Sequence, residues 1–295
     1  MKKTALITGG TGLLGFNWGR LIRNHYDTIL GLNSRDNKLC GVGKVHLKLD
    51  NVEDLVSQLS TLKVDIIIHT AALTNVEYCE KEPELAHYIN VRLASNLATA
   101  CEYLGIKLVQ ISTDHLFGGQ KAFYTEVCPV FPLNVYAETK YKAEKAIMSL
   151  NSKSLIIRTN FYGWGTYYRK SFSDTIIQSL GANKEVFIFQ DVFFTPILID
   201  SLVEVVHQLI QLDVNGIFNV VGEERISKYH FAVCIAERFE LDARKLVPCS
   251  ISDRLDLVRR PKDMSLDNQK VCNTLGRKIG SFKADISKLY DNRVG

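Results

Sequence analysis

A tyrosine and a lysine lie four residues apart in the segment PLNVYAETK, residues 132–140. If a helix begins in this segment, Tyr136 and Lys140 share one of its faces, because positions i and i+4 are neighbours on a helix surface. A free phenol has a pKa of about 10 and is a poor proton donor at neutral pH. A nearby ammonium stabilises the phenolate and lowers that pKa. The pair is therefore suited to giving a proton to a carbonyl oxygen while hydride reaches the carbonyl carbon.

Polar side chains follow the apolar run KLVQI, residues 107–111. If that run is a strand of an open parallel sheet, Ser112, Thr113 and Asp114 emerge at the carboxyl edge, where such sheets bind ligands. A threonine hydroxyl there can hold a substrate oxygen and stabilise the charge that develops on it. Alone, a YxxxK pattern arises by chance on surface helices, and threonine often ends a strand. Together with a glycine loop upstream, this threonine and the tyrosine–lysine pair indicate one catalytic set.

That glycine loop lies in TALITGGTGLLG, residues 4–15, where three glycines with the spacing GxxGxxG follow an apolar run. Glycines let the backbone turn tightly and approach a pyrophosphate, whose charge then lies at the N-terminus of the next helix. A strand before the loop and a helix from about Leu13 are the context that dinucleotide binding requires. The residues that we expect at the cofactor here are Gly9, Thr11, Gly12, Leu13 and Leu14.

The end of the second apolar run bears on the choice of nicotinamide cofactor. An acid at this place would bind the ribose diol and repel a 2′-phosphate. The sequence has Asn33, Ser34 and Arg35 there, which favours NADPH. Asp36 follows directly and keeps NADH open, and Arg35 can equally be a solvated loop residue. The expected cofactor is NADPH, with NADH as the alternative.

The elements that must position these residues alternate along the chain. Runs rich in branched residues predict strands over residues 4–8, 28–32, 45–49, 64–69, 107–113 and 154–159. Strands that are apolar on both faces are typical of a covered parallel sheet. Between two of these runs, apolar residues recur at helical spacing over residues 84–104. The pattern predicts a doubly wound, Rossmann-type α/β fold.

The regular alternation weakens after about residue 160. VFIF, residues 186–189, predicts an isolated strand, and residues 199–212 and 227–239 predict amphipathic helices. We therefore expect a cofactor-binding domain over residues 1–160 and a smaller α/β substrate lobe over residues 161–295. No linker-like Pro/Gly/Ser tract separates them, so some later segments are expected to return to the main sheet.

Composition excludes several classes of protein. The 36 basic and 32 acidic residues give a net charge of +4, too balanced to indicate binding to nucleic acid or an anionic membrane. No segment approaches the roughly 18 apolar residues of a membrane span. The seven cysteines show neither CxxC nor Cys/His spacing, so neither disulfides nor zinc is expected, and a cytoplasmic location fits best.

The motifs together resemble those of extended short-chain dehydrogenases/reductases, specifically the dTDP-4-dehydrorhamnose reductase family. Beyond the glycine loop, the resemblance includes VDIIIHTAALTNVEYCEKEPELAHYINV, ISTDHLFGG, PLNVYAETKYKAEKA, IIRTNFYGWG, QDVFFTP and RRPKDMSLDNQK. These segments occur in family order, from residue 4 to about residue 270.

The resemblance implies roles for individual residues. The catalytic residues would be Thr113, Asp114, Tyr136 and Lys140. The cofactor would also contact Asp50, Asn51, Ala71, Ala72, Thr74, Ser112, Tyr136, Lys140 and Phe161, and the substrate would contact Thr74, His115, Phe161 and Arg260. As alternatives, an acid such as Asp50 also caps helices well, and the two alanines can be small packing residues.

Some positions depart from the family pattern. His115 stands where tyrosine is usual, and its imidazole titrates at about pH 6.5. Phe193 and Phe194 replace smaller residues and either reshape the sugar pocket or, as we favour, pack in a core. Asn17 replaces a glutamate that some relatives are proposed to use for metal at a dimer contact, so no metal is expected, and a homodimer is left open. A planar guanidinium can take two phosphate oxygens, which makes Arg260 a candidate for a nucleotide diphosphate, although loop arginines are often only solvated.

The expected reaction is NADPH-dependent reduction of the 4-keto group of a nucleotide-linked 6-deoxyhexose, with dTDP-4-dehydro-L-rhamnose as first candidate. A dehydratase or epimerase is the nearest alternative, but the resembling dehydratases place Asp-Glu after the threonine, and this chain has Asp114-His115. A non-catalytic cofactor-binding regulatory subunit is the alternative from another class.

Overall fold

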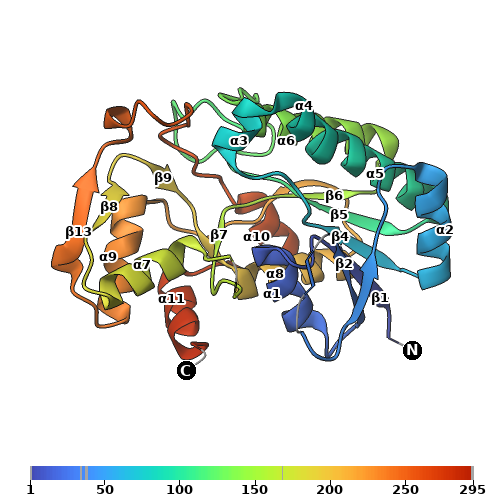
Figure 1. Ribbon diagram of the computed structural model, residues 1–295, viewed down its shortest axis with the longest axis horizontal. Coiled ribbons are helices and arrows are strands. Elements are labelled where there is room, and N and C mark those ends of the chain that lie inside the picture. Colours follow the sequence, from blue (N-terminus) through green and yellow to red (C-terminus); the bar gives the residue numbers. More distant parts are fainter. Residues whose placement is uncertain (1, 34, 37–38, 168, 294–295) are drawn as a thin grey trace. The chain divides into compact units, whose positions relative to one another are not determined.

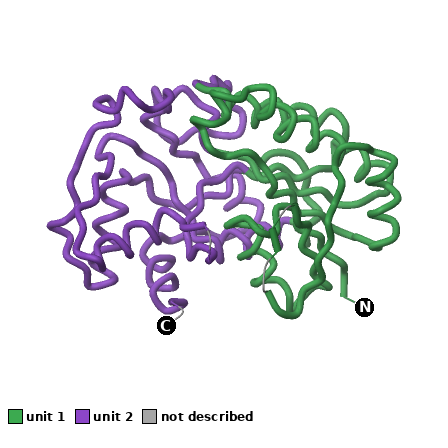
Figure 2. Tube along the Cα trace, in the orientation of Figure 1, with its two compact units in different colours: residues 1–113, 134–157, 210–218 green, residues 114–133, 158–209, 219–295 purple. Residues whose placement is uncertain are grey.

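The computed structural model describes residues 2–33, 35–36, 39–167 and 169–293. The chain forms two compact units, each built from three segments of sequence (Figure 2). Unit 1 contains Met1–Thr113, Asn134–Ile157 and Ile210–Phe218, and unit 2 contains Asp114–Leu133, Arg158–Leu209 and Asn219–Gly295. The expected boundary at residue 160 lies close to one of these transitions. Residues 114–133 belong to unit 2, and residues 210–218 belong to unit 1. The limits expected for the two domains stay a prediction.

Unit 1 is built on a seven-stranded sheet in the order β11-β6-β5-β4-β1-β2-β3. Figure 1 labels β1, β2, β4, β5 and β6 of this sheet. The strands are β1 (Thr4–Thr8), β2 (Asp27–Leu32), β3 (Gly43–His46), β4 (Ile66–His69), β5 (Lys107–Ile111), β6 (Leu155–Arg158) and β11 (Gly216–Asn219). The five pairs from β3 to β6 are parallel. Nearly every residue of β1, β4 and β5 is buried, which explains why these strands read as continuous apolar runs. The predicted doubly wound α/β fold is confirmed.

The helices of unit 1 are α1 (Leu13–Ile22), α2 (Val52–Leu62), α3 (Val76–Lys81), α4 (Pro83–His87), α5 (Leu93–Leu104) and α6 (Val135–Leu150). The apolar face of α2 supplies Leu55 and Leu59 to a core that α5 completes with Leu97 and Cys101. The single helix expected over residues 84–104 is divided. A π-helical turn, Tyr88–Arg92, lies between α4 and α5 and buries Asn90.

The last segment of unit 1 is held to the sheet by polar contacts. Lys107 Nζ, at the start of β5, donates to Val214 O at 2.9 Å and to Asn215 Oδ1 at 2.5 Å. The amide of Gly216 donates to Ser154 O at 2.9 Å. These bonds place β11 beside β6, so a segment late in the sequence completes the sheet.

Unit 2 has short strands and a separate core. Its strands are β7 (Phe161–Tyr162), β8 (Val186–Phe189), β9 (Phe193–Phe194), β10 (Ile197–Leu198), β12 (Ile226–Ser227) and β13 (Leu246–Cys249), which pair as β10-β7, β12-β9 and β13-β8. Its helices are α7 (Phe172–Gly181), α8 (Ile199–Gln211), α9 (Lys228–Arg238), α10 (Gln269–Leu275) and α11 (Phe282–Asp291), with short 3-10 turns at Ala243–Lys245 and Ile251–Asp253. The last two residues of α8 belong to unit 1.

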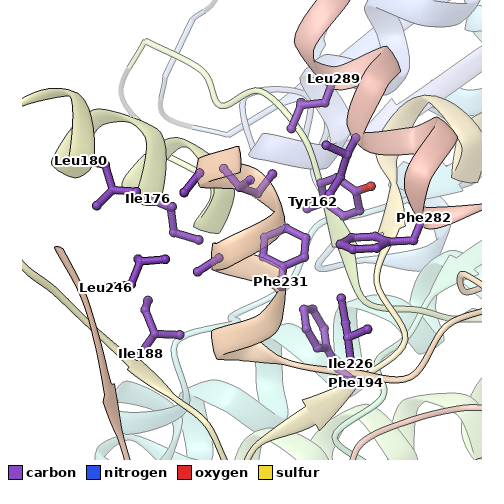
Figure 3. Close-up of a cluster of buried hydrophobic side chains, with 14 of the residues drawn as sticks. Tyr162, Ile176, Leu180, Ile188, Phe194, Ile226, Phe231, Leu246, Phe282 and Leu289 are labelled. Carbon is purple, nitrogen blue, oxygen red and sulfur yellow. The ribbon is translucent and has the colours of Figure 1, made fainter. Parts of the chain in front are cut away.

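The ring of Phe231, from α9, lies at the centre of the unit 2 core (Figure 3). Its centroid is 5.0 Å from that of Tyr162, 5.6 Å from Phe194 and 5.8 Å from Phe282. These aromatic contacts join α9 to β7, β9 and α11, so unit 2 has a hydrophobic core of its own.

Within the described ranges, no helix is long and apolar enough to cross a membrane.

Candidate active site

The glycine loop of unit 1 leaves no room for side chains. Gly9 has φ +67° and accepts a backbone hydrogen bond from Gly12 N at 2.8 Å. A Cβ on Gly15 would lie 2.4 Å from Gly9 O, and a Cβ on Gly9 would lie 2.9 Å from Ala71 N. Gly12 is the N-cap of α1, and no side chain caps the first turn. Because the glycines of the loop carry no side chains, a pyrophosphate can come close to the backbone amides at the N-terminus of α1. This arrangement fits the pyrophosphate of a dinucleotide.

A buried threonine–histidine contact joins the ends of β1 and β4 beneath this loop. Thr8 Oγ1 and His69 Nδ1 are 2.7 Å apart, and Thr70 Oγ1 donates to Thr8 O at 2.7 Å. Burial, with a smaller effect of Lys140, lowers the pKa of His69 to about 3, so the imidazole is neutral. The contact holds Ala71 against Gly9. No motif in the sequence indicated His69.

Two polar contacts join the region after β2 to β3. His46 Nδ1 lies 2.8 Å from Asn33 O, and Asp36 forms an exposed ion pair with Lys44 at 2.8 Å. Ser34 lies outside the described residues. The carboxylate that kept NADH open is therefore engaged by a lysine.

Tyr136 and Lys140 both lie on α6, one turn apart, as predicted from their spacing. The helix begins because the side chain of Asn134 accepts a hydrogen bond from Ala137 N at 2.9 Å. Lys140 Nζ donates to Ile111 O, at the end of β5, at 2.7 Å. Burial lowers the pKa of Lys140 to about 8, while the nearby Glu144 carboxylate raises it. The lysine therefore keeps its charge at neutral pH and loses it in mildly alkaline solution.

Two further polar side chains, Ser112 and Asn90, fix α6 and the residues around it. Ser112 Oγ donates to Glu144 Oε1 at 2.5 Å, in a buried contact. Asn90 Nδ2 donates to Thr139 Oγ1 and to Leu73 O, each at 3.0 Å. Asn90 in the π-helical turn thus ties the loop that holds Ala71, Ala72 and Thr74 to the first turns of α6. The sequence patterns indicated neither Asn90 nor Glu144.

Asp50 and Asn51 precede α2. Asn51 is its N-cap and accepts a hydrogen bond from Asp54 N at 3.0 Å. Asp50 accepts a hydrogen bond from the hydroxyl of Tyr88. The capping function considered for Asp50 belongs to Asn51.

Unit 2 begins with Asp114, which directly follows Thr113 in the chain. Both residues are buried. Asn160 Nδ2 donates to Asp114 Oδ2 at 2.5 Å, and His115 Nε2 lies 4.0 Å from Asp114 Oδ1. Burial lowers the pKa of His115, Asp114 opposes this effect, and Lys228 and Arg260 add to it. His115 is therefore a neutral imidazole at pH 7.

A basic hollow of about 490 Å³ lies in unit 2. Its lining includes Gly118, Gly119, Arg254, Arg259, Arg260 and Lys262. Gly119 has φ +80°, and a Cβ there would lie 2.8 Å from Pro261 Cβ. The loop that follows Asp114 thus packs against the arginine–proline segment, and only glycine permits this close approach.

The two phenylalanines that depart from the family pattern have different surroundings. Phe194 is buried in the unit 2 core, consistent with the packing interpretation. The ring of Phe193 lies under Arg225 at 3.8 Å, and Arg225 pairs with Asp263 at 2.7 Å. Phe161 is partly buried in β7 and pairs with Ile197 of β10.

Asn17 lies on α1 and is buried. Its Nδ2 donates to Leu13 O at 2.9 Å. In the part of the chain that the structure describes, no three His, Cys, Asp or Glu side chains are grouped to hold a metal. The absence of a metal stays a prediction.

The model of the RmlD substrate binding domain family matches residues 2–294. The chain belongs to this family. A crystal structure of dTDP-4-dehydrorhamnose reductase from Bacillus anthracis str. Ames in complex with NADP superposes with a TM-score of 0.87 at 28% identity, covering 99% of this chain and 100% of that one. RmlD-family membership and the Rossmann-type sheet confirm the resemblance found in the sequence, and the chain is an NAD(P)H-dependent oxidoreductase of this type.

Proteins similar to this chain have more than one function. The probable low-salt glycan biosynthesis reductase Agl14 of Haloferax volcanii is 28% identical over 97% of this chain and 96% of its own length. Methionine adenosyltransferase 2 subunit beta of Mus musculus is 30% identical over 93% of this chain and 83% of its own length. Similarity to both reductases and a subunit of another enzyme means that the substrate must be argued from the site.

Proposed function

We propose that the protein uses NADPH to reduce the 4-keto group of a nucleotide-linked 6-deoxyhexose, with dTDP-4-dehydro-L-rhamnose as the first candidate. The observation that carries this proposal is the buried ammonium of Lys140, held at 2.7 Å by Ile111 O and one helical turn from Tyr136. A buried charge costs free energy, and a purely structural role does not need one.

The chain's own residues provide the proton and hold the substrate oxygen. Tyr136 gives its phenolic proton to the carbonyl oxygen, and Lys140 stabilises the phenolate that remains. Thr113 hydrogen-bonds the same oxygen and stabilises its developing charge. NADPH supplies the hydride when it is bound. Lys140 also binds the nicotinamide ribose.

Unit 1 binds the cofactor. The glycine loop binds the pyrophosphate, and the residues at the tip of β2 bind the adenosine ribose. Asp36, which follows this tip, forms an ion pair with Lys44. Asp50 and Asn51 lie at the adenine, while Ala71, Ala72, Thr74 and Ser112 line the rest of the cofactor.

Substrate binding falls chiefly to unit 2. Asp114, held by Asn160, and the neutral His115 bind sugar hydroxyls, and Phe161 packs on the sugar. Arg260, in the lining of the basic hollow, binds the diphosphate. An Arg260→Ala variant is expected to raise KM for the sugar nucleotide and leave KM for NADPH unchanged.

The proposal is tested with a panel of dTDP-, UDP-, GDP- and CDP-linked 4-keto sugars and both nicotinamides, following absorbance at 340 nm without oxygen. Oxidation of NADPH by one of these sugars is expected, at a higher kcat/KM than with NADH. Tyr136→Phe should lower kcat by about 100-fold or more, because general acid catalysis typically contributes that much. Equal rates for the variant and the wild type would rule out the proposed acid.

A non-catalytic cofactor-binding subunit is the second candidate. It is supported by the 30% identity to methionine adenosyltransferase 2 subunit beta. Binding of NADPH without turnover of any keto sugar in the panel, together with co-purification of a larger enzyme, would favour it. A dehydratase function is less consistent with the sequence, because His115 stands at the position where a dehydratase would need a second acid.

A further inference from the structure

Lys228 is the first residue of α9, and its ammonium lies over aromatic rings. Its Nζ is 3.6 Å from the ring centroid of Phe194 and 5.0 Å from that of Phe172. Its amide donates to Val192 O at 2.9 Å, and the preceding Ser227 caps the helix by accepting from His230 N at 3.0 Å. Both backbone and side chain are therefore held in place, and cation–π attraction stabilises the position.

Among the described residues, none forms a hydrogen bond or ion pair with this ammonium. Other cations of unit 2 are paired: Arg225 with Asp263 at 2.7 Å, and Lys262 with Asp191 at 3.0 Å. A partly buried ammonium that lacks such a partner is costly, because buried charges are normally paired. The three N–H donors of the Lys228 ammonium are therefore consistent with a binding site in which a ligand accepts their hydrogen bonds.

The charges around Lys228 leave an excess of positive charge. Asp114 and Arg260 both lie within electrostatic reach of Lys228. His115, which is in the same surroundings, is kept neutral by burial. Two cations and one carboxylate give a net charge of +1 in this part of unit 2. An anionic ligand group would balance it, whereas a neutral sugar hydroxyl would not.

We propose that Lys228 is a substrate-binding residue whose ammonium, together with Arg260, binds the diphosphate of the nucleotide-linked substrate. This inference rests on the proposed function in taking the substrate to be a sugar nucleotide. The rings of Phe194 and Phe172 hold the ammonium facing the anion, and the anion supplies the hydrogen bonds that the protein does not.

The pH dependence of binding follows from the same surroundings. Burial, and to a smaller extent Arg260, lower the pKa of Lys228 to about 8, while Asp114 opposes them. The ammonium is present below about pH 8 and is lost above it. A bound anion stabilises the charged form, so binding near pH 8 takes up a proton.

The test measures binding of dTDP, UDP, GDP and CDP to the whole protein by calorimetry at pH 7.0, without turnover. Lys228→Met is expected to weaken the best nucleotide on the order of tenfold to a hundredfold, as for loss of a hydrogen bond to a charged group. Lys228→Arg should retain most of the affinity. The affinity for inorganic pyrophosphate should likewise fall in Lys228→Met and be mostly retained in Lys228→Arg. Thymidine and NADPH should bind to the wild type and to all variants with equal affinity. Lys184→Met, at an exposed lysine of unit 2, is the matched control and should bind like the wild type.

Raising the pH from 7.0 to 9.5 should weaken nucleotide binding to the wild type and leave binding to Lys228→Arg almost unchanged. Equal affinity of Lys228→Met and the wild type would overturn the inference, as would a failure of all four nucleotides to bind at millimolar concentration. If Lys228→Met does not fold, a flat pH profile of the wild type overturns it. Nucleotide binding that depends on Lys228, without reduction of any keto sugar, would instead count against the proposed function alone.

Discussion

Glu144 lies one helical turn beyond Lys140 and is buried, with Ser112 donating to it at 2.5 Å. Its charge raises the pKa of Lys140 against the larger effect of burial. The carboxylate thus keeps the lysine protonated at the pH where the tyrosine must lose and regain its proton. Glu144 is a positioning and tuning residue, because it acts through Lys140.

Glu144→Gln is therefore expected to shift the alkaline limb of the kcat profile to lower pH by about half to one unit. The amide can still accept from Ser112, so the fold should be preserved. The sign follows from the lysine: without the carboxylate its pKa drops further below about 8, and the protonated form disappears earlier as the pH rises. Glu138→Gln, at an exposed glutamate of α6 that pairs with Lys142, is the control and should not move the limb. An unshifted limb in Glu144→Gln would refute the tuning role.

Single residues could be predicted from sequence where their spacing is one that a known chemical function requires. The positions of Tyr136 and Lys140 on one helix, and the tight loop at Gly9, followed from sequence. Glu144 and Asn90 did not, because an acid or an amide inside a helix has no sequence signature until the neighbouring strand or loop is known. Lys228 was hidden for the same reason.

At the scale of elements, the start of α6 decides where Tyr136 lies. Asn134 caps this helix through Ala137 N, and the π-helical turn Tyr88–Arg92 turns Asn90 toward Thr139 on the same helix. A π-helical turn adds one residue per turn and is frequent at functional sites. The two contacts fix both the first residue of α6 and its rotation.

Asn134→Ala is expected to lower the free energy of unfolding by about 1 kcal/mol, the usual value for a lost N-cap. It should also lower kcat, because the fraying turn holds Tyr136. Ser171→Ala removes the N-cap of α7 and should cost similar stability with unchanged kcat. Denaturant unfolding and steady-state rates measure both effects. Equal effects of the two variants on kcat would contradict a role of the α6 cap in catalysis.

The strands β1, β2, β4, β5 and β6 were predictable within a few residues because most of their residues are buried and each strand reads as an apolar run. The largely exposed strand β3 begins and ends two to three residues earlier than expected, and β11 was not predicted. The π-helical turn was not predicted either, since one inserted residue barely changes helical periodicity. The two-residue strands of unit 2, such as β9 and β12, were also missed. Strands this short carry no alternation, and their pairing depends on partners far along the chain.

At the scale of the molecule, each unit is assembled from three segments. A domain over residues 1–160 was expected from the point where the alternation of strands and helices weakens. That expectation stays a prediction, but the contacts of residues 210–218 argue against an independent fragment. Lys107 would lose its acceptors at Val214 and Asn215, and β6 would lose β11, one of its two neighbours.

A chain truncated after residue 160 should therefore not fold cooperatively, because it would expose a strand edge and part of the core. Thermal unfolding followed by circular dichroism, and binding of NADP, compare it with the full chain. A sharp transition together with NADP binding by the fragment would show that the first 160 residues are sufficient.

The late position of β11 also has a consequence for protein synthesis. About 60 residues separate the end of β6 from the end of β11, so at roughly 5–20 residues per second the ribosome needs on the order of 3 to 12 seconds to deliver the missing strand. Throughout that delay the nascent sheet has an open border at β6, where another polypeptide can attach. We therefore expect chaperones to bind the nascent chain during this delay, or variants with a weakened β11 to be expressed more slowly in cells.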